Sequence, residues 1–378
     1  GALIAWADDR SGSFDIYAQR LGENGTCEWV SGGIAVCAAS GDQIDPGITV
    51  SGVEGAVISW TDGRGIATDI YAQRLDSFGV SQWATDGIPV CSEPHDQIDP
   101  LIVGDEDDGA IVTWLDFRLM ETTYHEIYTQ RIDPGGVGLW ASGGEVVCPY
   151  RDKRLENVAG VSDGAEGVIS VWNELPGGIY VQRVDYGGLV QWGNYGVAIC
   201  PPDWESKYPQ IVSNGSGGAM IAWQDARGGE EDIYAQMVDG NGTEVWPVND
   251  IAICTASGEQ LYPKVADDGA GGAIICWQDD RSGNFDVFAQ RINSSGSTMW
   301  STDGIGLCTA NGDQEHIQII PDGSGGAILV WADERNSEYD IYAQRVDATG
   351  TELWSAGGLP VCTETGDQHY PQLTSDDA

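Results

Sequence analysis

The sequence predicts an all-β protein, a seven-bladed β-propeller made of four-stranded antiparallel blades. Each repeat contains four short β-rich runs separated by turns rich in Gly, Asp, Asn and Ser, and no helical period competes with them. Four short strands in a repeat of about fifty residues are typical of a propeller blade. The repeats are marked by a tryptophan that ends an apolar run, at Trp6, Trp60, Trp114, Trp172, Trp223, Trp277 and Trp331.

The seven repeats fill the chain, so we expect one propeller domain over residues 1–378 rather than the two or three domains that its length would otherwise suggest. Their approximate boundaries are 1–54, 55–108, 109–166, 167–217, 218–271, 272–325 and 326–378.

The last repeat illustrates the strands in order. The apolar run "GGAILVWADER" at 325–335 is followed by "DIYAQRVD" at 340–347 and by "TELWSAGGLPVC" at 351–362, which leads into "PQLTS" at 371–375. Turn-like stretches separate these runs, as expected for strands joined by short hairpins.

The two ends predict how the ring closes. The chain enters at a second strand, "GALIAW", and finishes with a first strand, "PQLTSDDA". We expect the C-terminal strand to pair with the N-terminal blade, because this closure would protect two strand edges from unwanted pairing. The chain begins with Gly and has no signal-like start, so it is also expected to be part of something longer.

The charge excludes several partners. The formal net charge is −42, with 59 acidic residues against 17 Lys and Arg. Nucleic acid and anionic membrane surfaces are therefore not expected partners, because both need clustered cations. No run of 18 apolar residues is present, which predicts no membrane insertion.

Seven of the nine cysteines occupy one repeat position, at the end of the fourth strand. Equivalent positions on the outer strands of a ring would lie beyond the ~7 Å between Cα atoms that a disulfide allows. We interpret these residues as small buried hydrophobes. They are Cys37, Cys91, Cys148, Cys200, Cys254, Cys308 and Cys362.

An ion pair across a hairpin is predicted in six repeats. Each carries Trp-x-Asp-x-Arg followed by an acid, and repeat 4 lacks both the arginine and the acid. Such joint loss favours a structural pair over a ring of ligand sites. The predicted pairs are Arg10 with Asp15, Arg64 with Asp69, Arg118 with Glu126, Arg227 with Asp232, Arg281 with Asp286, and Arg335 with Asp340.

The hexapeptide "DIYAQR" raises the same choice between function and fold. Along a strand its Asp, Tyr and Gln point one way and its Ile, Ala and Arg the other, so neither face is purely apolar. A strand pressed between neighbouring blades needs this mixture, whereas a catalytic group is not needed seven times. We therefore interpret it as an inter-blade strand.

A ring of carboxylates is a candidate cation site. An acid follows the repeat cysteine by five residues in six repeats, and such oxygens near a central channel could bind Ca²⁺ or another hard cation. The alternative is an acid that caps its own turn. No other cofactor is expected. The candidate ligands are Asp42, Asp96, Glu259, Asp313 and Asp367, and the sixth acid of the series is Glu205.

Repeats 3 and 4 depart from the pattern and predict a ligand patch. Repeat 3 has a longer hairpin, "RLMETTYHE", and "YRDKR" in place of "GDQ", while repeat 4 has "DWESKY". All these departures map to one face, the top, where a cationic and aromatic patch could bind an acidic glycan or a protein. Neutral drift of a degenerating blade is the alternative. The patch residues are His125, Tyr150, Arg151, Lys153, Arg154, Trp204 and Lys207.

The repeat, with its "DIYAQR", "GDQ" and "W.D.R" elements, resembles the propeller repeats of secreted bacterial proteins, including exported cargo with C-terminal sorting tails. The resemblance covers all seven repeats. It implies an exported or cell-surface seven-bladed propeller and no particular activity.

Three functions follow as hypotheses. The first is a non-enzymatic binding or scaffold module, extracellular or at the cell surface, a monomeric propeller whose ligand is a protein or a glycan. The second is a glycosidase or lyase that uses carboxylates such as Asp203 or Glu205 as acid and base. The third is a multivalent lectin with one weak site per blade.

Overall fold

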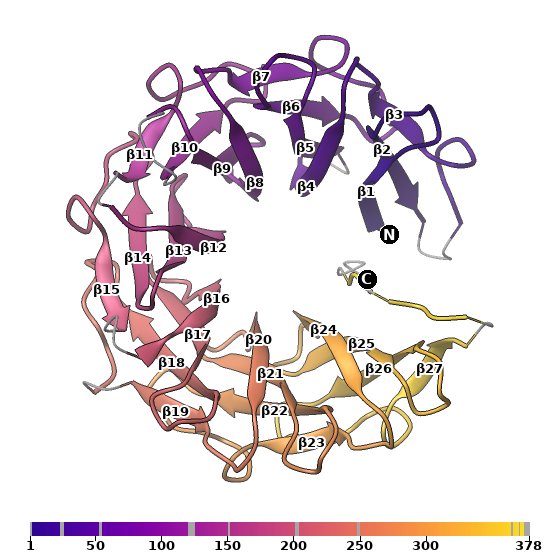
Figure 1. The fold of residues 1–378 in the computed structure, drawn as a ribbon, viewed down its shortest axis with the longest axis vertical. Coiled ribbons are helices and arrows are strands. Elements are labelled where there is room, and N and C mark those ends of the chain that lie inside the picture. The colour runs from indigo at the N-terminus through magenta and orange to yellow at the C-terminus, as the bar shows by residue number, and fades with distance from the viewer. Residues whose placement is uncertain are drawn as a thin grey trace. The chain divides into compact units, whose positions relative to one another are not determined.

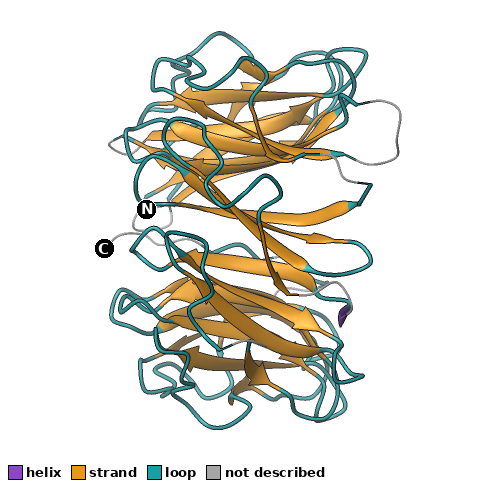
Figure 2. Cartoon of the chain, turned by 90° about the vertical axis from the view of Figure 1, so that its left-hand side faces the viewer, coloured by secondary structure: helices purple, strands orange, loops and turns teal. Residues whose placement is uncertain are grey.

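The computed structural model describes residues 2–22, 26–52, 55–119, 125–149, 152–200, 204–247, 250–363, 366–369 and 371–373. Strands and loops account for almost all of them (Figure 2). None of the helical structure in these ranges is long and apolar enough to span a membrane.

The chain is a seven-bladed β-propeller, as predicted: the structure contains seven antiparallel sheets, six with four strands and one with three in the described residues (Figure 1). The three-stranded sheet consists of β1 (Ala2–Asp8), β2 (Asp15–Leu21) and β3 (Ile34–Cys37). The second sheet consists of β4 (Gln43–Ser51), β5 (Gly55–Asp62), β6 (Asp69–Leu75) and β7 (Ile88–Cys91). The third consists of β8 (Gln97–Gly104), β9 (Ala110–Asp116), β10 (Glu126–Ile132) and β11 (Glu145–Cys148).

The remaining four sheets repeat the same order. Their strands are β12 (Leu155–Ser162), β13 (Val168–Glu174), β14 (Ile179–Val184) and β15 (Val197–Cys200); β16 (Lys207–Ser213), β17 (Ala219–Asp225), β18 (Asp232–Val238) and β19 (Ile251–Cys254); β20 (Gln260–Asp267), β21 (Ala273–Asp279), β22 (Asp286–Ile292) and β23 (Ile305–Cys308); and β24 (Gln314–Pro321), β25 (Ala327–Asp333), β26 (Asp340–Val346) and β27 (Leu359–Cys362).

The chain forms two compact units, whose division passes through the fourth sheet. Unit 1 contains residues up to Ser170 together with Val181–Val197, and unit 2 contains Val171–Tyr180 and Ala198–Ser375. Within unit 1 the first strands β4, β8 and β12 contact one another in turn, and within unit 2 so do β16, β20 and β24 (Figure 1). We call these six first strands the inner strands.

The sheets are offset from the sequence repeats by one strand, because each inner strand comes from the end of the preceding repeat. The first sheet has no inner strand among the described residues, in which Pro371, Gln372 and Leu373 form no strand. Residues 374–378 lie outside the described residues, so closure by the C-terminal strand stays a prediction.

The second strands form the core. Every residue of β5 is buried, and the same is true of β9, β13, β17 and β21. A short continuous apolar run is what a strand covered on both faces requires. The tryptophans near their ends are fully buried. Four of them stack on the aromatic ring of the paired third strand: Trp60, Trp114, Trp172 and Trp277.

The polar residues of "DIYAQR" serve the fold. The Gln73 amide donates to the Ala84 carbonyl at 2.7 Å and accepts the Trp83 N–H at 3.0 Å, which holds the loop that leads to β7. The indole N–H of Trp83 and the guanidinium of Arg74 then both reach the carbonyl of Pro134 in the next sheet, at 3.1 Å. These bonds agree with the interpretation of the hexapeptide as an inter-blade strand.

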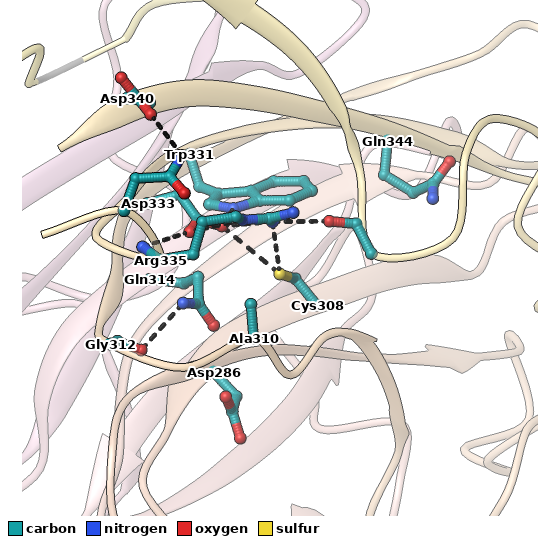
Figure 3. A network of polar contacts seen from close by, with 12 residues as sticks. Asp286, Cys308, Ala310, Gly312, Gln314, Trp331, Asp333, Arg335, Asp340 and Gln344 are labelled. Atoms are coloured by element: carbon teal, nitrogen blue, oxygen red, sulfur yellow. Dashed lines mark hydrogen bonds and ion pairs between the residues drawn. The ribbon is translucent and has the colours of Figure 1, made fainter. Parts of the chain in front are cut away.

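A buried aspartate, Asp333, joins the last sheet to the preceding one through an arginine (Figure 3). Asp333 accepts the Trp331 indole N–H at 2.8 Å and two guanidinium bonds from Arg335, at 2.8 and 2.6 Å. Arg335 Nη2 also donates to the Gly357 carbonyl at 2.7 Å and lies 3.1 Å from the Sγ of Cys308, which ends β23 of the preceding sheet. We call this set of contacts the arginine hub.

The hub recurs around Arg64, Arg118 and Arg281, each of which contacts an aspartate, a cysteine of the preceding sheet and a carbonyl. Burial raises the pKa of Asp333, but hydrogen bonds from Arg335 and Trp331 outweigh it and hold the pKa below its ordinary value. The aspartate therefore stays ionised inside the protein.

The repeat cysteines are buried thiols, as predicted, except that Cys362 is only half-buried. No described cysteine forms a disulfide. Burial raises the pKa of the Cys37, Cys91, Cys200, Cys254 and Cys308 thiols to about 12, so they remain protonated and inert at neutral pH.

We expect Arg281→Gln to lower the free energy of unfolding by about 3 kcal/mol, because Asp279 would remain buried without its cation. Urea unfolding followed by tryptophan fluorescence measures the loss. Arg10→Gln is the matched control, because Arg10 binds Asp8 in the same way but its side chain is 44% exposed. The control should lose far less stability, and equal losses would contradict the role of burial.

Candidate functional site

Five inner strands, β4, β8, β16, β20 and β24, contain a β-bulge opposite the second strand of their sheet. Their pairing with the second strand slips by one residue, for example between Leu261 and Lys264 and between Glu315 and Gln318. The residue inside the bulge has a positive φ, which is uncommon outside glycine. Bulges re-aim side chains, and such strain concentrates at functional sites. These residues are Asp45, Asp99, Tyr208, Tyr262 and His316, with φ of 51° to 56°. Asn157 at the equivalent position of β12 has a φ of 52°.

The identity of this residue differs between the two units. At this positive-φ position unit 1 has Asp45, Asp99 and Asn157, whereas unit 2 has two tyrosines and a histidine. The position two residues further on differs in the same way: Gly47 and Leu101 in unit 1, and Gln210, Lys264 and Gln318 in unit 2. The inner strands of unit 2 therefore present aromatic and polar side chains at positions where those of unit 1 have other residues.

Unit 2 contains a cavity of ≈ 360 Å³ at this surface. It lies between β20 and β21 of one sheet and β24 of the next, with the segment 371–373 beside it. We call it the inner-strand cavity. Its lining residues are Tyr262, Lys264, Gln278, Glu315, His316, Ile317, Gln318 and Gln372.

Two polar side chains of the cavity have no partner within the described part of the chain. Lys264 forms no hydrogen bond or ion pair there, and burial lowers the pKa of its ammonium group. Gln278 is only 5% exposed and makes no side-chain hydrogen bond with a described residue. Buried polar groups are normally hydrogen-bonded, so these two are available to a ligand.

The remaining groups are held in place. Tyr262 is 45% exposed, its ring meets Tyr208 edge-on with centroids 4.9 Å apart, and its N–H donates to Gln224 Oε1 at 2.9 Å. Glu315 accepts the Tyr339 hydroxyl at 3.3 Å. Burial, together with the charge of Glu315, raises the pKa of Tyr339 to about 12, which keeps the hydroxyl protonated.

The bulges of unit 1 bring two carboxylates near each other. Asp45 and Asp99 occupy equivalent positions on β4 and β8, which contact one another. Burial, and then the charge of Asp99, raises the pKa of Asp45. Such a pair can hold one proton at a higher pH than an isolated carboxyl group.

Four described residues of the predicted patch of repeats 3 and 4 contact other groups of the protein. His125 is buried, with Nε2 2.6 Å from the Leu155 carbonyl, and Arg154 pairs with Glu156 at 2.9 Å. In unit 2, Trp204 lies under the guanidinium of Arg227, 3.8 Å from ring centroid to Cζ. Lys207 lies 3.4 Å from Glu231 and 3.8 Å from Glu205.

The other members of the patch add little. Lys153 is half-buried, and Tyr150 and Arg151 lie outside the described residues. Binding at the patch stays a prediction.

The predicted cross-hairpin ion pairs are wrong, because each arginine instead pairs with the aspartate two residues before it. The observed pairs are Arg10 with Asp8, Arg64 with Asp62, Arg118 with Asp116, Arg227 with Asp225, Arg281 with Asp279, and Arg335 with Asp333. None of these arginines forms an ion pair with Asp15, Asp69, Glu126, Asp232, Asp286 or Asp340.

The physical reason is the turn. A carboxylate two residues back accepts the Arg N–H as well as two guanidinium bonds, so the turn and the ion pair form together. The later acid is bonded by the residue after the arginine, as Asp286 is by Ser282 at 2.7 Å and Asp340 by Asn336 at 3.0 Å.

The predicted cation ligands cap the hairpin of the preceding sheet rather than their own turn. Asp42 accepts the Phe14 N–H at 3.1 Å, and Asp313 accepts the Phe285 N–H at 2.9 Å. Asp96, Glu259 and Asp367 accept the N–H groups of Thr68, Glu231 and Tyr339 in the same way. No group of three or more His, Cys, Asp and Glu within the described ranges is arranged to hold a metal, and calcium binding stays a prediction.

The inner-strand cavity was missed by sequence reasoning. The signal was present in the strings "QIDPG", "QIDPL", "SKYPQ", "QLYPK" and "QEHIQ", where the residue before the proline position changes from Asp to Tyr or His. Nothing in the sequence indicates that this residue sits in a bulge, so its exposure could not be foreseen.

Comparison with known proteins finds likeness of fold only. No protein-family model matches the chain, and no curated protein sequence matches it. A lectin from Burkholderia pseudomallei is similar in structure, with a TM-score of 0.52, 11% identity and 95% of each chain covered. An ulvan lyase has a TM-score of 0.48 and 10% identity over 82% of this chain and 86% of its own. An α-L-arabinanase from Penicillium chrysogenum has a TM-score of 0.42 and 11% identity over 81% and 93%.

One acid of unit 2 lacks the hydroxyl or amide partner that its counterparts have. Gly228 stands where Ser282 and Asn336 stand in later repeats, and Asp232 makes no side-chain hydrogen bond with any described residue. Burial, and then the charges of Asp225 and Glu230, raises the pKa of Asp232 to about 6. The folded state therefore binds more protons than the unfolded state between pH ~4 and 6, and this carboxyl reduces stability as pH rises through that window.

We expect Gly228→Ser to raise the free energy of unfolding by about 1 kcal/mol at pH 7.5, because a hydroxyl would bond the ionised carboxylate. A Cβ at this position would lie 3.0 Å from Asp232 Oδ2, which brings a hydroxyl within reach after a small shift. Gly228→Ala is the control for backbone effects. Urea unfolding at pH 7.5 and 4.5 should show the serine advantage shrinking at low pH, and an advantage that is equal at both values would refute this account.

Proposed function

We propose that the chain is a carbohydrate-binding propeller that acts as a non-enzymatic binding module outside the cell or at its surface. The inner-strand cavity is its glycan site. The observation that carries the proposal is the combination of an exposed Tyr262 ring with the unpartnered Lys264 and Gln278 in one cavity.

The chemistry of the cavity suits a sugar. The apolar face of a pyranose ring packs against an aromatic ring, while its hydroxyls need both donors and acceptors close by. Tyr262 supplies the ring, and Gln278, Gln318 and Gln372 supply amides that donate and accept. A concave site with a few convergent polar groups is the usual form of a small-ligand site.

The cavity also favours a single site over one site in each blade. Its residues depend on the tyrosine, histidine, lysine and glutamine of the unit 2 inner strands, and the inner strands of unit 1 carry Asp45, Gly47, Asp99 and Leu101 at the corresponding positions. A multivalent lectin would need equivalent groups in every blade. We therefore propose one glycan site for each chain.

A carbohydrate-active enzyme is the second candidate, and the carboxylate pair of unit 1 is the observation that favours it. Glycosidases use a pair of carboxyl groups, one of them with a raised pKa, and Asp45, with its raised pKa, lies near the carboxyl group of Asp99. The inner-strand cavity itself has Glu315 as the one carboxylate in its lining, and its oxygen is already bonded by Tyr339. Binding is therefore the better proposal for that cavity.

We expect a glycan array to give at least one ligand, which isothermal titration calorimetry should place at one site for each chain. Tyr262→Asn should lower the affinity for that ligand by about tenfold, because the stacking surface is lost. Asn still tolerates the positive φ, as Asn157 does. Phe78→Asn removes an aromatic ring that is 81% exposed and lies on a turn of unit 1, and it should leave the affinity unchanged. No ligand on the array, or equal affinities for the two variants, would exclude this site.

The enzyme alternative has its own test. Cleavage of polysaccharides in a broad screen, measured as reducing ends or as unsaturated products, should be absent from the wild-type protein. If the wild-type protein cleaves a polysaccharide and both Asp45→Asn and Asp99→Asn abolish this cleavage, the chain is an enzyme and the proposal of a non-enzymatic binding module is wrong.

A further inference from the structure

We propose that the inner-strand cavity selects acidic glycans, and that Lys264 binds the anionic group of one sugar, a carboxylate or a sulfate ester. The proposal rests on the glycan site proposed above and adds its ligand class. It differs from the predicted patch of repeats 3 and 4, because Lys264 stands outside that patch.

Lys264 is a cation without a counter-charge. No carboxylate within the described residues forms an ion pair with it, and the residue paired with it on β21 is Cys276. Burial raises the pKa of the Cys276 thiol to about 12, so the sulfur carries no charge at neutral pH. A cation removed from water and left unpaired is costly, and an anionic ligand would supply the missing partner.

Glu315 does not neutralise this cation, although it lines the same cavity. Its Oε2 accepts the Tyr339 hydroxyl at 3.3 Å and lies 4.0 Å from His316 Nε2, and it makes no ion pair with Lys264. The positive charge therefore faces the cavity uncompensated, in a protein whose formal net charge is −42.

Gln278 is an independent indication of a ligand. Gln278 is only 5% exposed and lines the cavity, and its side chain makes no hydrogen bond with the described residues. This amide carries two donors and an acceptor. An anion bound to Lys264 can accept from this amide, and both unsatisfied groups are then partnered.

The fold does not require a lysine at this position. The residues that take the same place in the bulges of other inner strands are Gly47, Leu101, Gln210 and Gln318. Gln210 and Gln318 lie on the two inner strands that flank β20 within unit 2. Lys264→Gln therefore tests the charge with a residue that the neighbouring strands already accommodate.

The test measures binding of residues 1–378 to three acidic tetrasaccharides by isothermal titration calorimetry. The probes are galacturonate and hyaluronan, which carry carboxylates, and κ-carrageenan, which carries sulfate esters, each beside its carboxyl-reduced or desulfated form. We expect at least one acidic probe to bind about tenfold or more tightly than its neutral form. Lys264→Gln should remove this preference and leave the affinity for the neutral form within about twofold.

Arg10→Gln is the control for long-range charge, because it removes one cation from an exposed position on the first sheet. It should keep the preference. Urea unfolding confirms that the variants are folded, and Lys264→Leu, which copies Leu101, replaces Lys264→Gln if the latter is not.

Equal affinities for acidic and neutral probes, or a preference that survives Lys264→Gln, would overturn the anion selectivity while the Tyr262 variant still decides the glycan site. A preference confined to κ-carrageenan would identify a sulfate ester as the anion, and one confined to galacturonate or hyaluronan would identify a carboxylate. Absence of binding to these probes and to the glycan array would overturn both proposals.

Discussion

The buried aspartate of the arginine hub is the interaction on which the rest of the structure depends. It ties the indole of its own strand, the guanidinium of its own turn and, through that guanidinium, the cysteine of the preceding sheet. Repeat 4 shows what happens without it: no arginine is present in its motif, and the indole nitrogen of Trp172 has no hydrogen-bond partner among the described residues. The division between the two compact units passes through the same repeat.

The hub also gives many of the repeated polar residues a role in the fold. A charge inside a protein is tolerated only when it is paired and hydrogen-bonded. The arginine and the aspartate of the hub therefore bind each other, and the glutamine of the hexapeptide bonds to backbone groups of its own sheet. The "GDQ" acids are bonded as well, because each accepts an amide N–H of the preceding hairpin. Among the described residues of the inner strands, Lys264 makes no hydrogen bond or ion pair and lines the cavity.

The sequence was sufficient for the fold but not for the site. Tryptophans at a regular period and four β-rich runs per repeat determine a propeller without any knowledge of contacts. The ion pairs were assigned to the wrong acid because Arg335 is followed by Asp340 and preceded by Asp333, and only the turn geometry decides between them. The cavity was missed for a related reason: Tyr262, Lys264 and Gln278 are brought together by a bulge and by the pairing of β20 with β21, and neither leaves a mark in the order of residues.

The repeats make the inner-strand cavity easier to interpret than a site in a unique fold. Each blade is an internal control for its neighbours, so a residue that the fold does not need appears as a departure from the common pattern. Lys264 is such a departure, because the two flanking inner strands have an uncharged residue at the same bulge position. These residues are Gln210 on β16 and Gln318 on β24. Evolution retains a local cost of this kind only where something offsets it. Lys264 is a half-buried cation with no ion-pair partner among the described residues, in a chain with 59 acidic residues, and the anionic ligand that we propose would supply that partner.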